Sequence, residues 1–206
     1  GDYQSATQRF WEAADRDRDN PDSYYNLAVT HHQLGKQHRN PKELEQAELY
    51  YNQCLDRDGN HLDCNRGLAV LLVEQGQSDN AFKLLEGWAD RSPDNANARV
   101  ELARLSEEVG DRARAKSLLE SALIIEPRNS RALAALGRIY ENMGEHRQAL
   151  LVYERSLASN TLQPAVAQRV ASLRTSLGGV AAPSSLNGPT RPGGTRIVTS
   201  PSNDLR

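Results

Sequence analysis

The same residue types return every 34 positions along most of this chain of 206 residues. The clearest series are glycines, alanines and leucines: Gly76, Gly110 and Gly144; Ala47, Ala81, Ala115 and Ala149; Leu68, Leu102 and Leu136. A fixed period of this length is typical of helical repeat arrays, in which each unit packs on its neighbours. Because such an array forms an extended surface, the period favours a binding role over a catalytic one.

Three aligned segments, 62–95, 96–129 and 130–163, each carry two amphipathic stretches at helical spacing. A glycine stands between the two stretches of each segment. Glycine just after a helix favours termination, because it accepts the left-handed conformation there. Pro93 and Pro127 close two of the segments, since proline cannot continue a helix. Each segment is therefore predicted to be an antiparallel helix hairpin.

Residues 21–61 form the same unit with seven extra residues, which lie between Gly35 and Ala47. Gly35 occupies the place of the turn glycines. Asn40 followed by Pro41 indicates an N-cap with proline in the first helical turn. We therefore expect a longer loop between the two helices of this unit, and a second helix that begins near Pro41.

The two ends of the chain depart from the period. Residues 1–20 match only the second helix of a unit, so we expect Phe10 or Trp11 to be exposed there, and self-association through this N-terminal edge is one hypothesis. Residues 164–177 predict one more helix with a polar face, as the end of a solenoid requires. Residues 178–206, rich in glycine, proline and serine, are predicted to be disordered.

The units resemble tetratricopeptide repeats, which are helix–turn–helix units of 34 residues. The resemblance covers residues 1–177, and the residues that carry it are Leu68–Ala69, Leu102–Ala103, Leu136–Gly137, Ala81, Ala115, Ala149, Tyr51, Tyr140, Tyr153, Pro93 and Pro127. It implies an all-α, right-handed superhelical solenoid of antiparallel hairpins. It further implies a concave face, lined by the first helices, that binds a peptide or protein, with no catalysis and no cofactor.

The predicted groove consists of first-helix residues outside the packing motif: Tyr25, Asn26, Val29, Arg66, Val70, Glu101, Arg104, Arg131, Arg138 and Glu141. Some family members grip a terminal carboxylate with basic and amide side chains. Val70, Glu101 and Ala135 occupy places that such a clamp would give to amide or basic groups. A mixed groove for an extended or helical peptide is the favoured functional interpretation. The alternative is a solvated face with local ion pairs, each of little energetic weight.

Composition argues against several other classes of protein. The net charge is −2, from 25 basic and 27 acidic residues, which is no electrostatic signature for nucleic acid or an anionic membrane. No apolar stretch reaches the ~18 residues of a membrane-spanning helix. The histidines His31, His32, His38 and His61 lack the spacing of a metal site. The sequence likewise shows no catalytic constellation, and it leaves a cytoplasmic or periplasmic location open.

Cys54 and Cys64 flank one turn between units. A disulfide is conceivable at this spacing and would indicate an exported protein, but two small buried cysteines are the favoured interpretation. The favoured function is a non-catalytic scaffold for protein–protein interaction. The alternative is the targeting region of a larger enzyme or of an envelope assembly protein.

Overall fold

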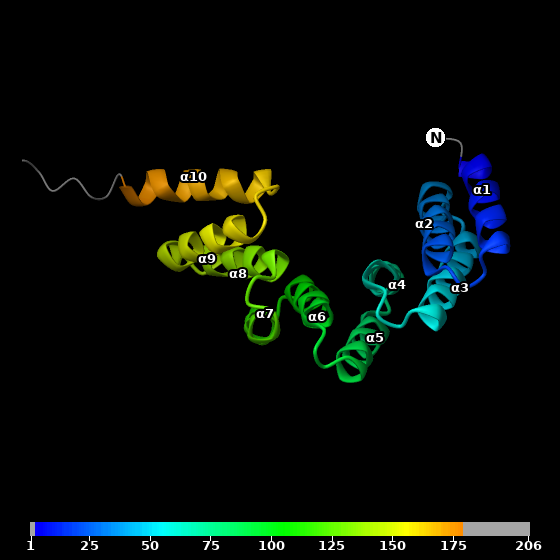
Figure 1. Ribbon diagram of the computed structural model, residues 1–206, viewed down its shortest axis with the longest axis horizontal. Coiled ribbons are helices and arrows are strands. Elements are labelled where there is room, and N and C mark those ends of the chain that lie inside the picture. The colour runs from blue at the N-terminus through cyan, green and yellow to red at the C-terminus, as the bar shows by residue number, and fades with distance from the viewer. Residues whose placement is uncertain (1–2, 179–206) are drawn as a thin grey trace, which may run out of the picture.

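The computed structural model describes residues 3–178, with side chains from Gln8 onward, and this part of the chain is a helical solenoid without strands (Figure 1). It consists of α1 Tyr3–Arg16, α2 Pro21–His38, α3 Pro41–Arg57, α4 Leu62–Glu74, α5 Ser78–Arg91, α6 Ala96–Glu108, α7 Arg112–Ile125, α8 Ser130–Asn142, α9 His146–Ser159 and α10 Pro164–Gly178. The predicted all-α class is confirmed. The predicted disordered tail lies outside the described residues, except for Gly178.

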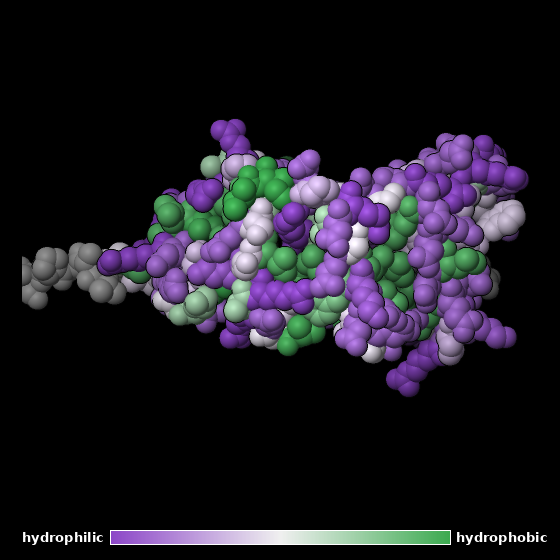
Figure 2. All heavy atoms as spheres, turned by 90° about the horizontal axis from the view of Figure 1, so that it is seen from below, coloured by the Kyte–Doolittle hydropathy of each residue, from purple (hydrophilic) through white to green (hydrophobic). Residues whose placement is uncertain are grey.

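The helices pair into hairpins that follow one another along an arc. Figure 1 shows α2, α4 and α6 on the inner side of the arc, with α3, α5 and α7 outside them. The inner helices also contact one another in series, and α8 continues the series through its contact with α6. Figure 2 views the arc from its outer side, which is mostly hydrophilic with separate hydrophobic areas.

Local signals set the helix ends. Asparagine side chains cap α2, α3, α6 and α8 by accepting a hydrogen bond from the first turn, as Asn20 does from the Asp22 amide at 3.0 Å. Gly76, Gly110 and Gly144 follow α4, α6 and α8 with φ of +76°, +87° and +75°. These left-handed conformations end the first helix of each regular hairpin.

The unit with the insertion differs from the prediction. α3 begins at Pro41 as expected, but the longer loop does not form, since only Arg39 and Asn40 separate α2 from α3. The extra residues lengthen the helices instead: α2 has 18 residues and α3 has 17, against 13 and 14 in α4 and α5. Gly35 lies inside α2, where an added Cβ would come 2.7 Å from Leu44 Cγ. Its role is close helix packing, and Arg39 makes the turn with φ of 49°.

Small residues let the helices of a hairpin approach each other. Ala81, Ala115 and Ala149 are completely buried, as the repeat pattern predicts. At Gly137 of α8 an added Cβ would come 2.6 Å from the ring of Tyr153 in α9. The glycine thus makes room for an aromatic ring that is itself buried. This packing holds the inner helix of each hairpin in a fixed position relative to its neighbours.

The two ends of the array differ. Trp11 on α1 is 58% exposed, in line with the expectation for an edge that lacks a neighbouring helix. At the other end α10 buries Val170 and Leu173 against the α9 hairpin and leaves its remaining face in water. That arrangement is the capping role expected of the terminal helix.

Candidate peptide-binding groove

The ten predicted groove residues all lie on the series α2, α4, α6 and α8. Nine of them are partly or fully exposed. The exception is Glu101, whose side chain is completely buried. Its prediction as a contact residue is wrong, because neighbouring arginines cover it. Whether the other nine bind a partner stays a prediction.

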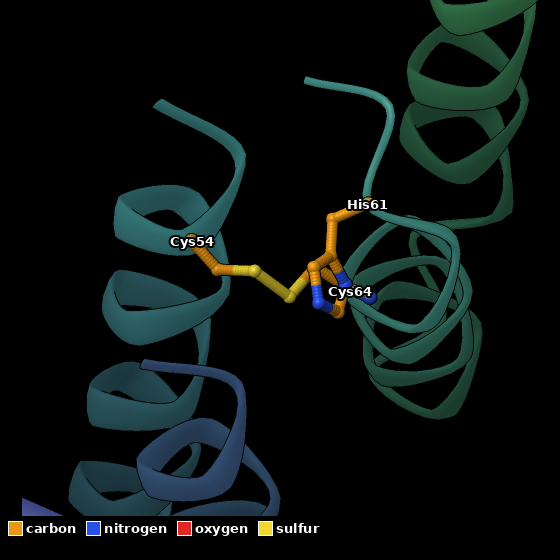
Figure 3. A group of neighbouring side chains, drawn as sticks. All are labelled: Cys54, His61 and Cys64. Carbon is orange, nitrogen blue, oxygen red and sulfur yellow. Dashed lines mark hydrogen bonds between the residues drawn. A yellow bond between two sulfur atoms is a disulfide. The ribbon is translucent and has the colours of Figure 1, made fainter. Parts of the chain in front are cut away.

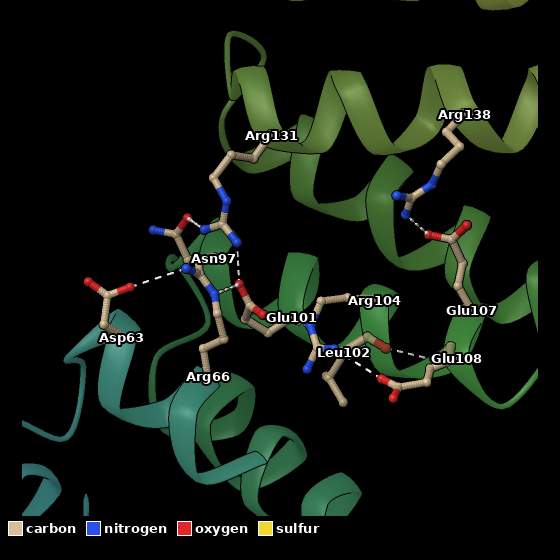
Figure 4. Close-up of polar contacts among 11 residues, drawn as sticks. Asp63, Arg66, Asn97, Glu101, Leu102, Arg104, Glu107, Glu108, Arg131 and Arg138 are labelled. Atoms are coloured by element: carbon tan, nitrogen blue, oxygen red, sulfur yellow. Dashed lines mark hydrogen bonds and ion pairs between the residues drawn. The ribbon is translucent and has the colours of Figure 1, made fainter. Parts of the chain in front are cut away.

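Glu101 lies at the centre of a cluster that joins three hairpins (Figure 4). It accepts hydrogen bonds from Arg66 Nε of α4 at 3.0 Å, from Arg104 Nε at 3.2 Å, and from Arg131 Nη2 of α8. The same arginines also bind outer partners. Arg66 pairs with Asp63, and Arg104 pairs with Glu108. The cluster therefore fixes the positions of α4, α6 and α8 relative to one another.

The charge state of Glu101 follows from these contacts. Burial by itself would raise the pKa of its carboxyl group. The hydrogen bond from Arg131 and the charges of Arg131 and Arg66 outweigh that effect, so the pKa lies below the ordinary value. Glu101 is thus an ionised carboxylate with its acceptor sites occupied, and its role is structural.

Further ion pairs link successive inner helices. Of their acidic partners, sequence reasoning named Glu141 as a groove residue but missed Glu107 and Glu74. Arg138 of α8 donates to Glu107 of α6 at 2.5 Å, and Arg169 of α10 donates to Glu141 of α8 at 3.2 Å. Glu74 of α4 forms an ion pair with Lys36 and a hydrogen bond with His32 of α2. The sequence did contain a signal for these ion pairs: a basic residue and an acidic residue lie about one repeat apart, on consecutive inner helices.

At the start of the arc, the lengthened α2 reaches the next hairpin. Lys36 Nζ lies 2.6 Å from Glu74 Oε1, and His32 Nε2 lies 2.9 Å from Glu74 Oε2. Burial opposes ionisation of Glu74, but the bonds from Lys36 and His32 lower its pKa below the ordinary value. The additional turn of α2 therefore contributes an ion pair between hairpins.

These pairs bear on the terminal-carboxylate clamp that some family members use. Arg66, Arg104, Arg131 and Arg138 all bind carboxylates within the chain. They are therefore not four free cations waiting for a terminal carboxylate. They retain further N–H donors, because a guanidinium carries five of them and these side chains each use one or two.

Two of the hollows on the described surface lie near predicted binding regions. One, of about 370 Å³, lies between α8 and α10 and is lined by Arg131, Ala134, Ala135, Arg138, Tyr153, Gln163, Ala165, Val166 and Arg169. The other, of about 300 Å³, lies at the N-terminal edge and includes the exposed Trp11 with residues of α2 and α3. The first adjoins the predicted groove, and the second adjoins the edge for which self-association stays a prediction.

Cys54 at the end of α3 and Cys64 in α4 form a disulfide, with their Cα atoms 6.5 Å apart (Figure 3). The favoured prediction of two unbonded cysteines is wrong, because the crossing of α3 and α4 brings their side chains together. His61 lies beside them, and its Nδ1 accepts a hydrogen bond from the Cys64 amide at 3.2 Å. Donor atoms of Cys54, His61 and Cys64 lie within 4.8 Å of one another. With both sulfurs bonded to each other, however, neither is a thiolate ligand.

Comparison with protein-family models gives matches over residues 21–61, 72–119 and 107–173, all to models described as tetratricopeptide repeat. These matches span more than half of the sequence. The chain belongs to the tetratricopeptide repeat family. No curated protein matches it significantly.

Solved structures show the same fold at low sequence identity. A thermophilic tetratricopeptide repeat protein of Thermus thermophilus, TTC0263, is 23% identical with a TM-score of 0.64, covering 84% of this chain and 91% of its own. PilF of Pseudomonas aeruginosa is 24% identical with a TM-score of 0.60, covering 80% and 72%. The human IFIT1 dimer with m7Gppp-AAAA is 19% identical with a TM-score of 0.60, covering 87% and 43%.

The repeats and these neighbours support a protein-interaction scaffold and imply protein partners. Tetratricopeptide repeat folds are generally non-catalytic. Among the described residues, no helix combines the length and the apolar character that crossing a membrane requires.

Proposed function

We propose that this chain is a non-catalytic scaffold that binds a peptide or protein segment along the inner face of its arc. The observation that carries the proposal is the fixed spacing of the inner helices. Burial of small residues within hairpins and ion pairs between hairpins hold α4, α6 and α8 in one arrangement. A surface organised before binding costs little conformational entropy when a partner docks.

The proposed contact residues are the nine partly or fully exposed members of the predicted set. Val70 of α4 offers a partly buried apolar side chain on the helix that also carries Arg66 of the polar cluster, and Tyr25 adds a partly buried aromatic side chain from α2. A surface that combines apolar and charged side chains in this way suits a segment of mixed composition.

A targeting role within a larger protein stays the second proposal, since a scaffold of this kind would serve either purpose. The disulfide between Cys54 and Cys64 adds that the chain works in an oxidising compartment, where such bonds persist. Thiol alkylation of the protein in its own host tests whether the compartment is oxidising, and full alkylation of both cysteines would contradict it.

The test of the scaffold proposal places a charge on the inner face. Val70→Glu introduces a carboxylate there, and Leu151→Glu makes the same change on α9 at a side chain that is 61% exposed. Affinity capture from the host, followed by binding measurements with each captured protein, compares the two variants with the unmodified chain. We expect a partner that binds the unmodified chain and the Leu151 variant but not the Val70 variant. Equal binding to all three, or no partner, would contradict the proposal.

A further inference from the structure

The hollow between α8 and α10 has a floor of small apolar groups. Ala134 and Ala135 contribute from α8, and Ala165 and Val166 contribute from α10. Its volume of about 370 Å³ lies near the lower end of the ~300–1,000 Å³ typical of ligand pockets. The hollow is therefore large enough to accept at least one apolar side chain from a bound segment.

The charged groups at this hollow are all basic. Arg131, Arg138 and Arg169 line it, and no acidic side chain does. Their carboxylate partners within the chain are much less exposed. Arg138 is 55% exposed and its partner Glu107 15%, while Arg169 is 63% exposed and Glu141 22%.

The pair formed by Arg131 and Glu101 has the same asymmetry, with exposures of 39% and 0%. An incoming group therefore meets guanidinium groups before it meets carboxylates. Arg138 uses only Nη2 and Arg169 only Nη1 in their bonds to these glutamates. The remaining N–H donors of both side chains are available for a second anion, and arginine binds carboxylates through pairs of such donors.

Elsewhere on the inner face, the cations of the ion pairs are accompanied by exposed carboxylates. Lys36 is 48% exposed and Glu74 36%. Arg66 and Arg104 are 35% and 34% exposed and pair with the buried Glu101, but each also pairs with a more exposed carboxylate, Asp63 at 48% and Glu108 at 46%. The excess of accessible positive charge is thus particular to the last inner helix and the capping helix.

From this geometry we propose that the hollow between α8 and α10 binds an acidic peptide segment, with one apolar side chain seated on the alanine floor and flanking carboxylates on Arg138 and Arg169. This inference rests on the proposed scaffold function and specifies the chemistry of the partner. It places the anchor of the segment at the C-terminal end of the array.

A nucleic-acid phosphate would also suit guanidinium groups, but two observations favour a peptide. The aromatic ring at the hollow belongs to Tyr153, which is buried and cannot stack on a base. Its hydroxyl group donates to Glu141 at 3.0 Å, and burial with this bond raises its pKa above the ordinary value, so it stays neutral. The net charge of −2 also gives no long-range attraction for a polyanion.

The experiment uses an array of short synthetic peptides in which charge and apolar content vary independently, probed with the full chain. We expect retention of peptides that carry Asp or Glu on both sides of one Leu, Ile or Phe. Replacing the acids by Lys should abolish retention. An oligouridylate single strand, added as a competitor, should not displace the retained peptides.

Two matched pairs of variants locate the site. Ala165→Glu places a carboxylate in the lining of the hollow, and Ala167→Glu makes the same change at an exposed position of α10 outside it. Arg169→Glu reverses a lining charge, and Arg174→Glu reverses a charge on the same helix whose partner is Glu154. The Ala165 and Arg169 variants should bind the selected peptide about tenfold more weakly, whereas the two control variants should bind as the unmodified chain does.

The outcomes separate this inference from the proposed function. Peptides that bind without an acidic preference, or that bind the Ala165 and Arg169 variants unchanged, would overturn the inference and leave the scaffold function standing. Effective competition by the oligouridylate would also overturn it, in favour of a nucleic-acid ligand. An array that retains no peptide at all would contradict both.

Discussion

Glu101→Gln is the most direct test of the polar cluster that joins α4, α6 and α8. The change removes one buried negative charge and keeps the shape of the side chain. Three guanidinium groups then lose the anion that they share, since Glu101 accepts from Arg66, Arg104 and Arg131. Each of these arginines is roughly one-third exposed, at 35%, 34% and 39%, so water compensates part of the loss.

Removing one member of a buried ion pair typically costs about 3–5 kcal/mol, and a hydrogen bond to a charged group contributes about 1.5–3 kcal/mol. Glutamine keeps one acceptor oxygen, and the arginines reach water. We therefore expect a loss of about 2–4 kcal/mol in the free energy of unfolding. For a domain of this size that corresponds to a fall in Tm on the order of 10 °C.

The loss in the free energy of unfolding caused by Glu101→Gln should become smaller at low pH. The pKa of Glu101 is lower in the folded chain than its ordinary value of 4.5. Its stabilising contribution is therefore fully present above 4.5 and is lost as the pH falls through the lower folded value. Below that point the native residue is protonated and resembles glutamine, so the difference in Tm between the two proteins should shrink.

Calorimetry and urea unfolding at about pH 7 and about pH 3 measure both effects. The control is Glu154→Gln, because Glu154 is 38% exposed and pairs with Arg174, which is 64% exposed. An exposed pair of this kind contributes at most about 1 kcal/mol. A Glu101 variant that is as stable as the native chain at neutral pH, or a penalty that is equal at both pH values, would refute this account of the cluster.

Three further changes test the packing. Reduction of the Cys54–Cys64 disulfide should lower the free energy of unfolding by roughly 2.7 kcal/mol, from the chain-entropy relation for a separation of 10 residues, as urea titration with and without a phosphine reductant would measure. Gly137→Ala should cost about 1–3 kcal/mol, because its Cβ would meet the Tyr153 ring at 2.6 Å, and thermal unfolding measures this. Ala115→Leu should cost a similar amount, about 1–3 kcal/mol, by overpacking a completely buried position, measured in the same way.

Matched controls accompany these changes. The reductant should not affect a chain in which both cysteines are alanine, and a further loss there would mean that the effect has another origin. Gly178→Ala should be neutral, since no atom lies within 4 Å of its added Cβ. Ala167→Leu changes an exposed alanine and should also be tolerated. Equal Tm values for the buried variants and these controls would show that the assigned packing is incorrect.

The insertion in 21–61 illustrates the limit of a local pattern. Asn40 and Pro41 predicted the start of α3 correctly, because a cap and a first-turn proline act within a few residues. The alignment of Gly35 with the turn glycines was misleading. A glycine has no side chain, so the same residue serves either a left-handed turn or a close helix crossing, and Leu44 on the facing helix determines which one forms.

The groove also combines features that residue spacing predicts with features that depend on contacts between hairpins. The repeat period placed all ten predicted residues on the inner series of helices, because a helical position follows from spacing along the chain. The period did not indicate that Glu101 is buried beneath arginines, or that the charged side chains lining the α8–α10 hollow are all basic. Those features depend on which side chains from separate hairpins face one another.

By itself the sequence determined the repeat unit, the helix ends of the regular hairpins and the all-α solenoid, since these depend on residue spacing, capping and small residues within one hairpin. Only the tertiary structure decided the contacts between hairpins. They include the Cys54–Cys64 bond, the Arg66–Glu101–Arg131 cluster and the exposed guanidinium groups at α8 and α10. The physical reason is distance along the chain. A side chain on the next hairpin, 10 to 35 residues away in these contacts, becomes a neighbour only through the angle and separation at which successive hairpins pack, and no short-range pattern encodes either quantity.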